Sequence, residues 1–263
     1  MKLSISNIAW KKEEDETVYN WMNELGFSGL EIAPTRIFPE SPYTKNQEAK
    51  KWYSELKLKH NIEISSIQSI YYQRPEKIFA SNEEFWFLLN YTAKAIDFAS
   101  DIKAQNIAFG CVKNRNLFRE EDYELGQFFF RQIADYAYSK NTIIGMEAVS
   151  EEYGSNYITD TKSAIELIRI INSEGFKLNL DTGNMLYNKE DIKVLDGNMD
   201  LINHVHISEP QLKPIQKREF YEQLFALLKQ NNYQNYVSIE MLRPDNLEEL
   251  HQSMAYVSEI FHK

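Results

Sequence analysis

The segment Asn203-His204-Val205-His206-Ile207-Ser208-Glu209 holds two histidines in a run where apolar residues alternate with other residues. Side chains two positions apart on a β-strand point to the same face. We therefore expect His204 and His206 to share one face of a strand. A histidine in a strand can be an ordinary hydrogen-bonded residue, so the segments around this run decide between a structural and a chemical role.

Three other apolar runs, 142–147, 177–181 and 236–240, each end in a carboxylate. The end residues of the four runs are Glu147, Asp181, His206 and Glu240. Counted in that order, they are separated by 34, 25 and 34 residues. Each separation is close to the roughly 30 residues of one strand and its crossover helix.

The rest of the chain repeats this alternation of strand and helix patterns. Further strands are predicted at 2–9, 29–33, 62–70 and 106–109. Helices are predicted at 17–25, 47–59, 82–100, 120–139, 160–172, 217–230 and 246–261, with a weaker one at 191–199. Prolines at 34, 39 and 42 indicate a long loop there, and 110–115 is predicted as a polar loop.

Eight strand–helix units predict an α/β protein in which a parallel sheet is covered by helices. Eight units also favour closure into a (β/α)8 TIM barrel, with residues 1–263 as one domain. An open, doubly wound sheet is the alternative. No G-x-G-x-x-G fingerprint for a dinucleotide occurs in the sequence.

Composition narrows the class of protein further. The chain has 263 residues, 43% of them hydrophobic, and a formal net charge of −10, which disfavours nonspecific binding to nucleic acid or to an anionic membrane. With Cys111 as the single cysteine, no intramolecular disulfide forms, which favours a reducing compartment and a cytoplasmic location. The sequence shows no signal-peptide pattern and no membrane-span pattern. The sequence leaves open whether the protein forms a homo-oligomer.

The four strand-end residues predict a metal site. In a barrel the carboxyl ends of all strands open on one face, so Glu147, Asp181, His206 and Glu240 are expected to converge there. Three carboxylates around one point repel each other unless a positive charge lies between them. Oxygen donors with one imidazole suit Mn²⁺, Mg²⁺ or Co²⁺, and Zn²⁺ is also compatible. The alternative is that each carboxylate stands alone in a loop.

These segments resemble the xylose isomerase-like barrel superfamily, which includes sugar isomerases and epimerases, endonuclease IV and inosose dehydratase. The resemblance covers nearly the whole chain and rests on Gly29-Leu30-Glu31, Met146-Glu147, Leu180-Asp181-Thr182-Gly183-Asn184, His204 to Glu209, and Ile239-Glu240. It implies that the four strand-end residues bind the metal and that the two glutamates also move protons. Two positions depart from the related ketose 3-epimerases: Asn184 replaces a histidine, and Leu212, beside Lys213, replaces an arginine.

The resemblance and the carboxylates together predict an isomerase or epimerase that acts on a sugar or sugar phosphate. A proton α to a carbonyl is only weakly acidic, and a metal near the carbonyl oxygen stabilises the enediolate as charge develops. Glu147 and Glu240 are the expected proton carriers. Return of the proton to the other face gives an epimer, whereas return to the neighbouring carbon gives an isomer.

Five residues are candidates for substrate contacts: Glu31, His204, Lys113, Arg115 and Trp10. Each also has a structural reading. Glu31 and His204 can support the site by hydrogen bonds, Lys113 and Arg115 can be solvated loop charges instead of phosphate ligands, and Trp10 can pack in the core instead of stacking on a sugar. Cys111 is expected to be a small buried residue instead of a nucleophile.

Three other functions compete with the isomerase reading. A nucleic-acid enzyme of the endonuclease IV type needs more histidines at strand ends than the two found here. An inosose-type dehydratase uses the same metal and the same proton removal, and then expels a hydroxyl group. A non-catalytic sugar-binding barrel does not need the predicted metal site.

Overall fold

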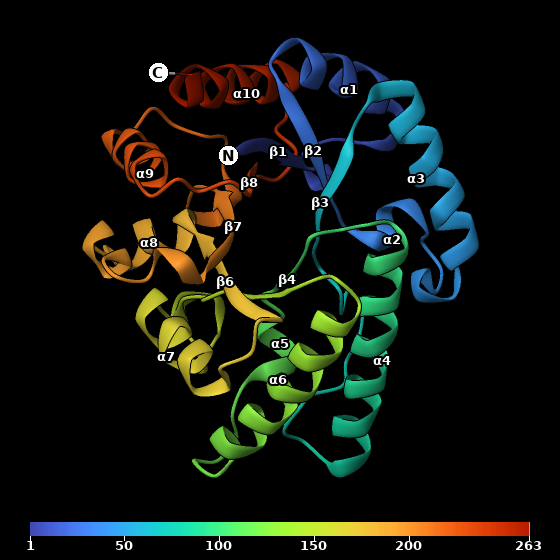
Figure 1. Ribbon diagram of the computed structural model, residues 1–263, viewed down its shortest axis with the longest axis vertical. Coiled ribbons are helices and arrows are strands. Elements are labelled where there is room, and N and C mark those ends of the chain that lie inside the picture. The colour runs from blue at the N-terminus through green and yellow to red at the C-terminus, as the bar shows by residue number, and fades with distance from the viewer. Residues whose placement is uncertain (263) are drawn as a thin grey trace.

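Eight parallel strands close into a barrel in chain order, β1 to β8, in the computed structural model, which describes residues 1–262 (Figure 1). Each strand pairs with its neighbours in the sequence, and β1 also pairs with β8. The strands are β1 Lys2–Ser6, β2 Phe27–Ile32, β3 Glu63–Ile67, β4 Asn106–Phe109, β5 Ile144–Met146, β6 Phe176–Asp181, β7 Ile202–Ile207 and β8 Tyr236–Ile239. The predicted (β/α)8 barrel is confirmed, and the open sheet is wrong.

Helices surround the ring of strands (Figure 1). They are α1 Asp15–Glu24, α2 Pro34–Ile37, α3 Asn46–His60, α4 Asn82–Asp101, α5 Val112–Arg115, α6 Asp122–Ser139, α7 Thr161–Ile171, α8 Thr182–Asn188, α9 Glu219–Gln230 and α10 Leu247–His262. Helix α7 illustrates why they form. Ala164, Ile165 and Ile168 recur at helical spacing and are buried, and Asp160 caps the first turn by accepting a hydrogen bond from the backbone of Ser163.

Three predicted segments differ from the structure. Short helices α2 and α5 lie in the regions predicted as loops, and Pro34 occupies the first turn of α2, where its missing N–H costs nothing. The helix predicted at 191–199 is wrong, because this region holds two 3₁₀ turns separated by Gly197 at φ +70°. The helix that follows β6 is instead α8, which begins directly after the strand and ends before residue 191.

The inside of the barrel is polar over much of its height. Ser4 and Ser65 share a hydrogen bond of 2.6 Å, and Asn106 donates to Asn179 Oδ1 at 3.1 Å. Gly145 makes room for this packing, because a Cβ there would lie 2.5 Å from Asn106 Oδ1. Apolar side chains instead fill the layer between the strands and the helices. Hydrogen-bonded polar side chains therefore lie inside the barrel, below the carboxyl ends of the strands.

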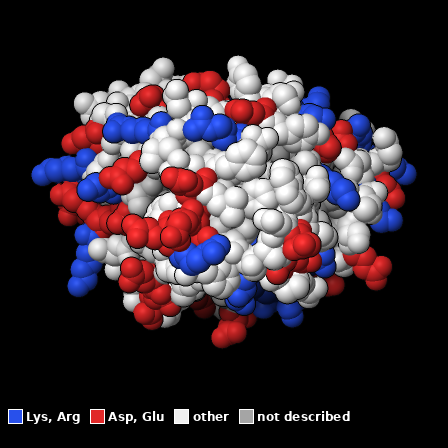
Figure 2. All heavy atoms as spheres, turned by 90° about the horizontal axis from the view of Figure 1, so that it is seen from below, with Lys and Arg blue, Asp and Glu red and all other residues white. Residues whose placement is uncertain are grey.

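The surface carries mixed charge. On the face shown in Figure 2, basic side chains lie among acidic ones, next to an area without charged residues. Within residues 1–262, no helix has the length and apolar character needed to cross a bilayer. The expectations of a cytoplasmic location, of no nucleic-acid partner and of a homo-oligomer stay predictions.

Candidate metal centre

The carboxyl ends of β5 to β8 bring the four predicted metal ligands together. One potential ligand atom from each of Glu147, Asp181, His206 and Glu240 lies within 4.8 Å of all the others. His206 Nδ1 is 3.1 Å from Glu240 Oε2, 3.5 Å from Glu147 Oε2 and 3.8 Å from Asp181 Oδ2. The prediction that all four meet at one rim of the barrel is therefore met by the structure.

Neighbouring groups orient two of these carboxylates. Asp181 Oδ1 accepts a hydrogen bond from the backbone N–H of Asn184 at 2.6 Å, and this contact caps α8. Asp181 Oδ2 accepts from the Ser208 hydroxyl at 2.6 Å. Glu147 Oε2 accepts from Asn179 Nδ2 at 2.9 Å. The geometry of the cluster is thus set by hydrogen bonds that do not require a metal.

The electrostatics of the cluster fit a cation. Burial raises the pKa of Glu147 well above its ordinary value, and the charges on Glu240 and Asp181 add to this. Burial, with the charge on Glu240, raises the pKa of Asp181 to about 6. Burial lowers the pKa of His206, but Glu31 and Glu240 outweigh that effect and raise it overall. Three crowded carboxylates with one imidazole match the donors of a divalent ion.

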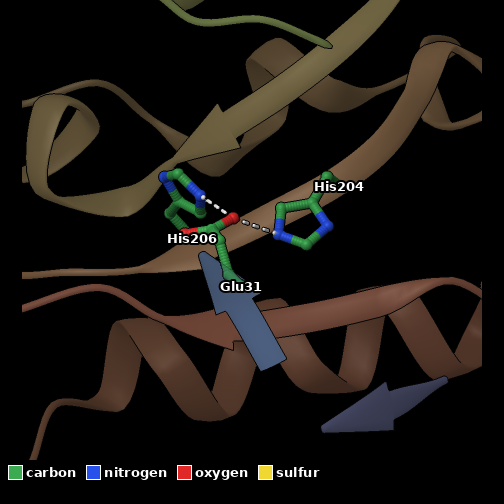
Figure 3. A group of neighbouring side chains, drawn as sticks. All are labelled: Glu31, His204 and His206. Atoms are coloured by element: carbon green, nitrogen blue, oxygen red, sulfur yellow. Dashed lines mark hydrogen bonds and ion pairs between the residues drawn. The ribbon is translucent and has the colours of Figure 1, made fainter. Parts of the chain in front are cut away.

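Glu31 faces both histidines of β7 (Figure 3). Its Oε2 atom is 3.0 Å from His206 Nε2 and 3.1 Å from His204 Nε2. On the other side of the carboxylate, Gln68 Nε2 donates to Oε1 at 3.0 Å. Since His206 Nε2 is engaged with Glu31, Nδ1 is the ring nitrogen that faces the three carboxylates of the centre.

Glu31, His204 and His206 form a second group of potential ligand atoms within 4.8 Å of one another. His206 Nε2 is within hydrogen-bond distance of Glu31 at 3.0 Å, whereas His204 Nε2 lies 3.1 Å from the same oxygen but has no hydrogen-bond partner among the described residues. Burial alone would raise the pKa of Glu31, but its contacts with His206 and His204 outweigh burial and lower it. Glu31 and His204 are fully buried, which favours the structural reading, and their predicted substrate contacts stay predictions.

Replacing Glu31 with glutamine should weaken metal binding by about 10–100-fold, the usual cost of losing an outer hydrogen-bond partner of a metal ligand. Glutamine removes the negative charge that faces both imidazoles. Its amide N–H₂ group also favours the His206 tautomer with the proton on Nδ1. Calorimetric titration with Mn²⁺ measures the effect, and Glu63→Gln on β3, whose carboxylate accepts from Tyr53 at 2.6 Å, is the control. Unchanged affinity in Glu31→Gln would contradict the supporting role.

Arg115 and Trp10, two of the predicted substrate contacts, are both buried. Arg115 is fully buried, and its guanidinium donates to the backbone oxygens of Gly110 and Glu147. Burial lowers its pKa to about 10. The reading of Arg115 as a solvated charge is therefore wrong, and its predicted phosphate contact stays a prediction. Trp10 is buried, as the core reading expects, and its indole N–H donates to Asp15 at 2.7 Å.

Lys113 and Cys111 line a cavity next to the centre. Lys113 is exposed, so a role in substrate binding remains a proposal. Cys111 is partly exposed, and burial of its thiol raises the pKa to about 12, so the thiolate needed of a nucleophile is disfavoured at neutral pH.

Sequence reasoning missed three supporting residues: Asn179, Ser208 and Gln68. A signal was present for the first two. Asn179 lies two positions before Asp181, and Ser208 lies two positions after His206, so the period of a strand places each on the face of a ligand.

Metal binding should strengthen as the pH rises through about 6, the pKa of Asp181 in the metal-free protein. A carboxylic acid must lose its proton before it binds a metal. The folded pKa values of Asp181 and Glu147 lie above those of the unfolded chain, so the folded state holds more protons there. The contribution of these two groups to the free energy of unfolding of the metal-free protein therefore falls as the pH rises from about 4 to about 6.

Thermal unfolding with and without Mn²⁺, at about pH 5 and about pH 7.5, measures this linkage. The stabilisation by Mn²⁺ should be larger at the higher pH. An equal stabilisation at both would contradict the assignment of these carboxylates as ligands.

The closed barrel and its carboxylate–imidazole centre define a class of (β/α)8 proteins with a candidate metal site at the carboxyl ends of the strands. The family model described as xylose isomerase-like TIM barrel matches residues 19–260. The chain belongs to this family, and the resemblance of the sequence is thereby confirmed. A comparison with curated proteins gives no match.

Several solved structures share the fold over nearly the whole chain. The 3-keto-D-glucoside 4-epimerase of E. coli has a TM-score of 0.78 at 18% identity, and 98% of this chain and 99% of that chain are covered. The D-psicose 3-epimerase of Clostridium cellulolyticum H10, solved with D-tagatose, has a TM-score of 0.81 at 14% identity, covering 100% and 98%. A probable 3-DHS dehydratase of Bacillus anthracis has a TM-score of 0.71 at 17% identity, covering 100% and 99%. At these identities the likeness shows the fold alone.

Proposed function

We propose that the protein is a metal-dependent isomerase or epimerase that moves a proton α to the carbonyl of a sugar. One observation carries this proposal: Glu147 and Glu240 belong to a carboxylate–imidazole cluster and also line cavities that open beside it. Carboxylates at such a position can both hold a cation and exchange protons with a bound molecule. Two of the structural neighbours are named as sugar epimerases, which supports the same reading.

Glu147, Asp181, His206 and Glu240 would hold one divalent ion, with Mn²⁺, Mg²⁺ or Co²⁺ favoured by the oxygen donors and Zn²⁺ compatible. When bound, the ion supplies positive charge near the oxygens where negative charge develops. One glutamate takes the α proton, and the electron pair of the broken C–H bond moves toward the carbonyl oxygen to give an enediolate. Return of a proton to carbon completes the reaction without net oxidation or reduction.

The two oxygens of Glu147 have different surroundings. Oε2 accepts the hydrogen bond from Asn179 and faces His206. Oε1 lies toward Gly110, where an added Cβ would come within 3.3 Å of it. Gly110 lines the larger of the two cavities beside the centre. We therefore assign proton transfer to Oε1 and orientation of the carboxylate to Oε2.

A dehydratase is the second candidate, because it begins with the same proton removal and because one structural neighbour is named as a probable dehydratase. The two functions differ in the step after the enediolate forms. An isomerase returns the proton to carbon, whereas a dehydratase expels a hydroxyl group from the adjacent carbon.

The test is exchange of substrate protons with solvent deuterium. Protein purified without a chelator is first assayed for bound metal and then incubated in D₂O with a panel of ketoses. Deuterium at the α carbon with retention of all hydroxyl groups supports an isomerase or epimerase. A 2-keto-3-deoxy-type product indicates the dehydratase. Protein that contains no metal and catalyses no exchange would favour the non-catalytic sugar-binding barrel.

A further inference from the structure

We infer that the substrate is a keto-sugar joined to a second ring, that is, a glycoside, and not a free ketose or a sugar phosphate. The inference rests on the proposed function and names the substrate class of that same site. It comes from the shape and chemistry of the two cavities that meet at Glu147 and Glu240.

The two cavities adjoin at the candidate catalytic residues, which line both of them. The smaller cavity, of about 210 Å³, is lined by Asp181, Gly183 and Asn184 at the end of β6. The larger cavity, of about 990 Å³, extends over the loops that follow β1 to β4. Five residues line both: Glu147, Val149, Tyr153, Leu212 and Glu240. A molecule bound at the carboxylates can therefore reach into the larger cavity.

The larger cavity exceeds what one sugar ring requires. Its volume of about 990 Å³ lies at the upper end of the roughly 300–1,000 Å³ that is usual for pockets binding drug-sized ligands. A free ketose placed against the carboxylates would leave most of this space to water. A second ring, attached to the reacting sugar, would occupy it.

The wall of the larger cavity suits an uncharged ring. Tyr72, Tyr153 and Leu242 line it, and they are 58%, 40% and 54% exposed. Exposed apolar side chains that gather around one cavity indicate a ligand that covers them. Tyrosine offers a flat face for stacking and a hydroxyl group for a polar contact, a combination that fits a sugar or aromatic ring.

Two cations, Arg36 and Lys113, line the same wall. Arg36 is engaged by Asp15 at 2.6 Å and donates through Nη2 to the backbone oxygen of Trp10, while its buried Nη1 has no partner among the described residues. Lys113 is exposed, but a phosphate beside it would share the cavity with the carboxylates of Glu147 and Glu240. A bound cation would pair with these carboxylates, so their charge does not decide against a phosphate. The exposed apolar side chains of the wall are what favour a neutral substituent.

The backbone of this wall is held in an unusual conformation at several points. Ser69, Gln73, Cys111 and Leu212 all line the larger cavity, and their φ angles are +53°, +60°, +39° and +53°. Non-glycine residues in this region carry conformational strain. The same conformation occurs at nine described residues that do not line this cavity, so the inference rests on the volume and on the side-chain chemistry.

Binding of an unreactive probe tests the inference without requiring catalysis. Phenyl β-glucoside, which has no ketone, is titrated into the metal-loaded protein beside glucose. We expect the phenyl glycoside to bind at least ten-fold more tightly. Tyr72→Ala should remove most of this difference, whereas Tyr138→Ala, an equally exposed tyrosine (62%) on α6, should leave it intact. Equal binding of both probes by the wild type would overturn the inference.

Proton exchange then tests the substrate class directly. The probes are 3-keto-glucose, its phenyl glycoside, fructose and fructose 6-phosphate, each in D₂O. We expect kcat/KM for the phenyl keto-glycoside to exceed that for 3-keto-glucose at least ten-fold, and Tyr72→Ala to reduce that ratio. A preference for fructose 6-phosphate that disappears in Lys113→Ala would overturn the inference in favour of a phosphate site. Tight, Tyr72-dependent probe binding without exchange into any probe would support the glycoside site and contradict the proposed function.

Discussion

Glutamine at position 147 or 240 is expected to lower turnover by about 10²–10⁴-fold, the usual contribution of a positioned acid or base. Glutamine keeps the volume of glutamate and one oxygen donor. At position 147 that oxygen can still accept the hydrogen bond from Asn179. The glutamine side chain cannot take up a proton at neutral pH. A loss of turnover in these variants therefore reports on proton transfer and not on folding or packing.

The pattern of damage distinguishes the two reactions. In an epimerase, each variant should lose turnover but can still exchange the proton on the face served by the remaining glutamate. In an aldose–ketose isomerase, one substitution should be far more damaging than the other. Turnover and deuterium wash-in are measured with the bound metal quantified in each variant, and Glu151→Gln, an exposed residue of the β5–α7 loop, is the control. Near-wild-type rates in both metal-loaded variants would rule out the role of the glutamates.

Asp181→Asn is expected to remove metal binding while the protein stays folded. Loss of a carboxylate ligand should cost more than the roughly 10–100-fold that loss of an outer partner costs. The helix cap on α8 should survive, because asparagine caps about as well as aspartate, so we expect a change in the free energy of unfolding below about 1 kcal/mol. The variant also relieves the repulsion among three carboxylates in the metal-free protein.

The control for this variant is Asp160→Asn. Asp160 caps α7 through the backbone N–H of Ser163 at 2.7 Å and is outside the candidate ligand set. The Asp160→Asn variant should keep both the capped helix α7 and the bound metal. Metal content after purification and thermal unfolding with added Mn²⁺ give the two readouts. Equal metal content in Asp181→Asn and the wild type would count against the assignment.

The barrel and the location of the centre could be predicted because both depend on local patterns. Alternating strand and helix periods marked the eight units, and a parallel barrel places all strand ends on one rim. Once the eight units were recognised, residues at the ends of successive strands, such as Glu147 and Asp181, could be predicted to lie close together. No knowledge of long-range packing was needed for this step.

Residues that depend on distant parts of the chain were harder to place. Whether Glu31 faces the substrate or supports the histidines depends on its depth in the barrel, and the pairing of β2 with β1 and β3 sets that depth. Arg115 looks like a loop charge, but its main partner beyond the local turn is the backbone of Glu147 on another strand end. Helix α8 contains Gly183, which disfavours a helix, yet the Asp181 cap and the Ser208 hydroxyl, which accepts from the Gly183 N–H at 2.8 Å, support it.

The contact between Glu31 and His206 also bears on how the chain folds. These residues are 175 positions apart. During synthesis, Glu31 on β2 is therefore made long before its histidine partners on β7. Gln68, which follows β3, donates a hydrogen bond to Glu31 early in the chain, but a buried carboxylate without a cationic partner is still unfavourable. The N-terminal strands therefore enclose Glu31 less favourably before β7 is made. Contacts of such separation slow folding. We expect the barrel to close late, with the strands that carry the centre completing the interior that the first strands begin.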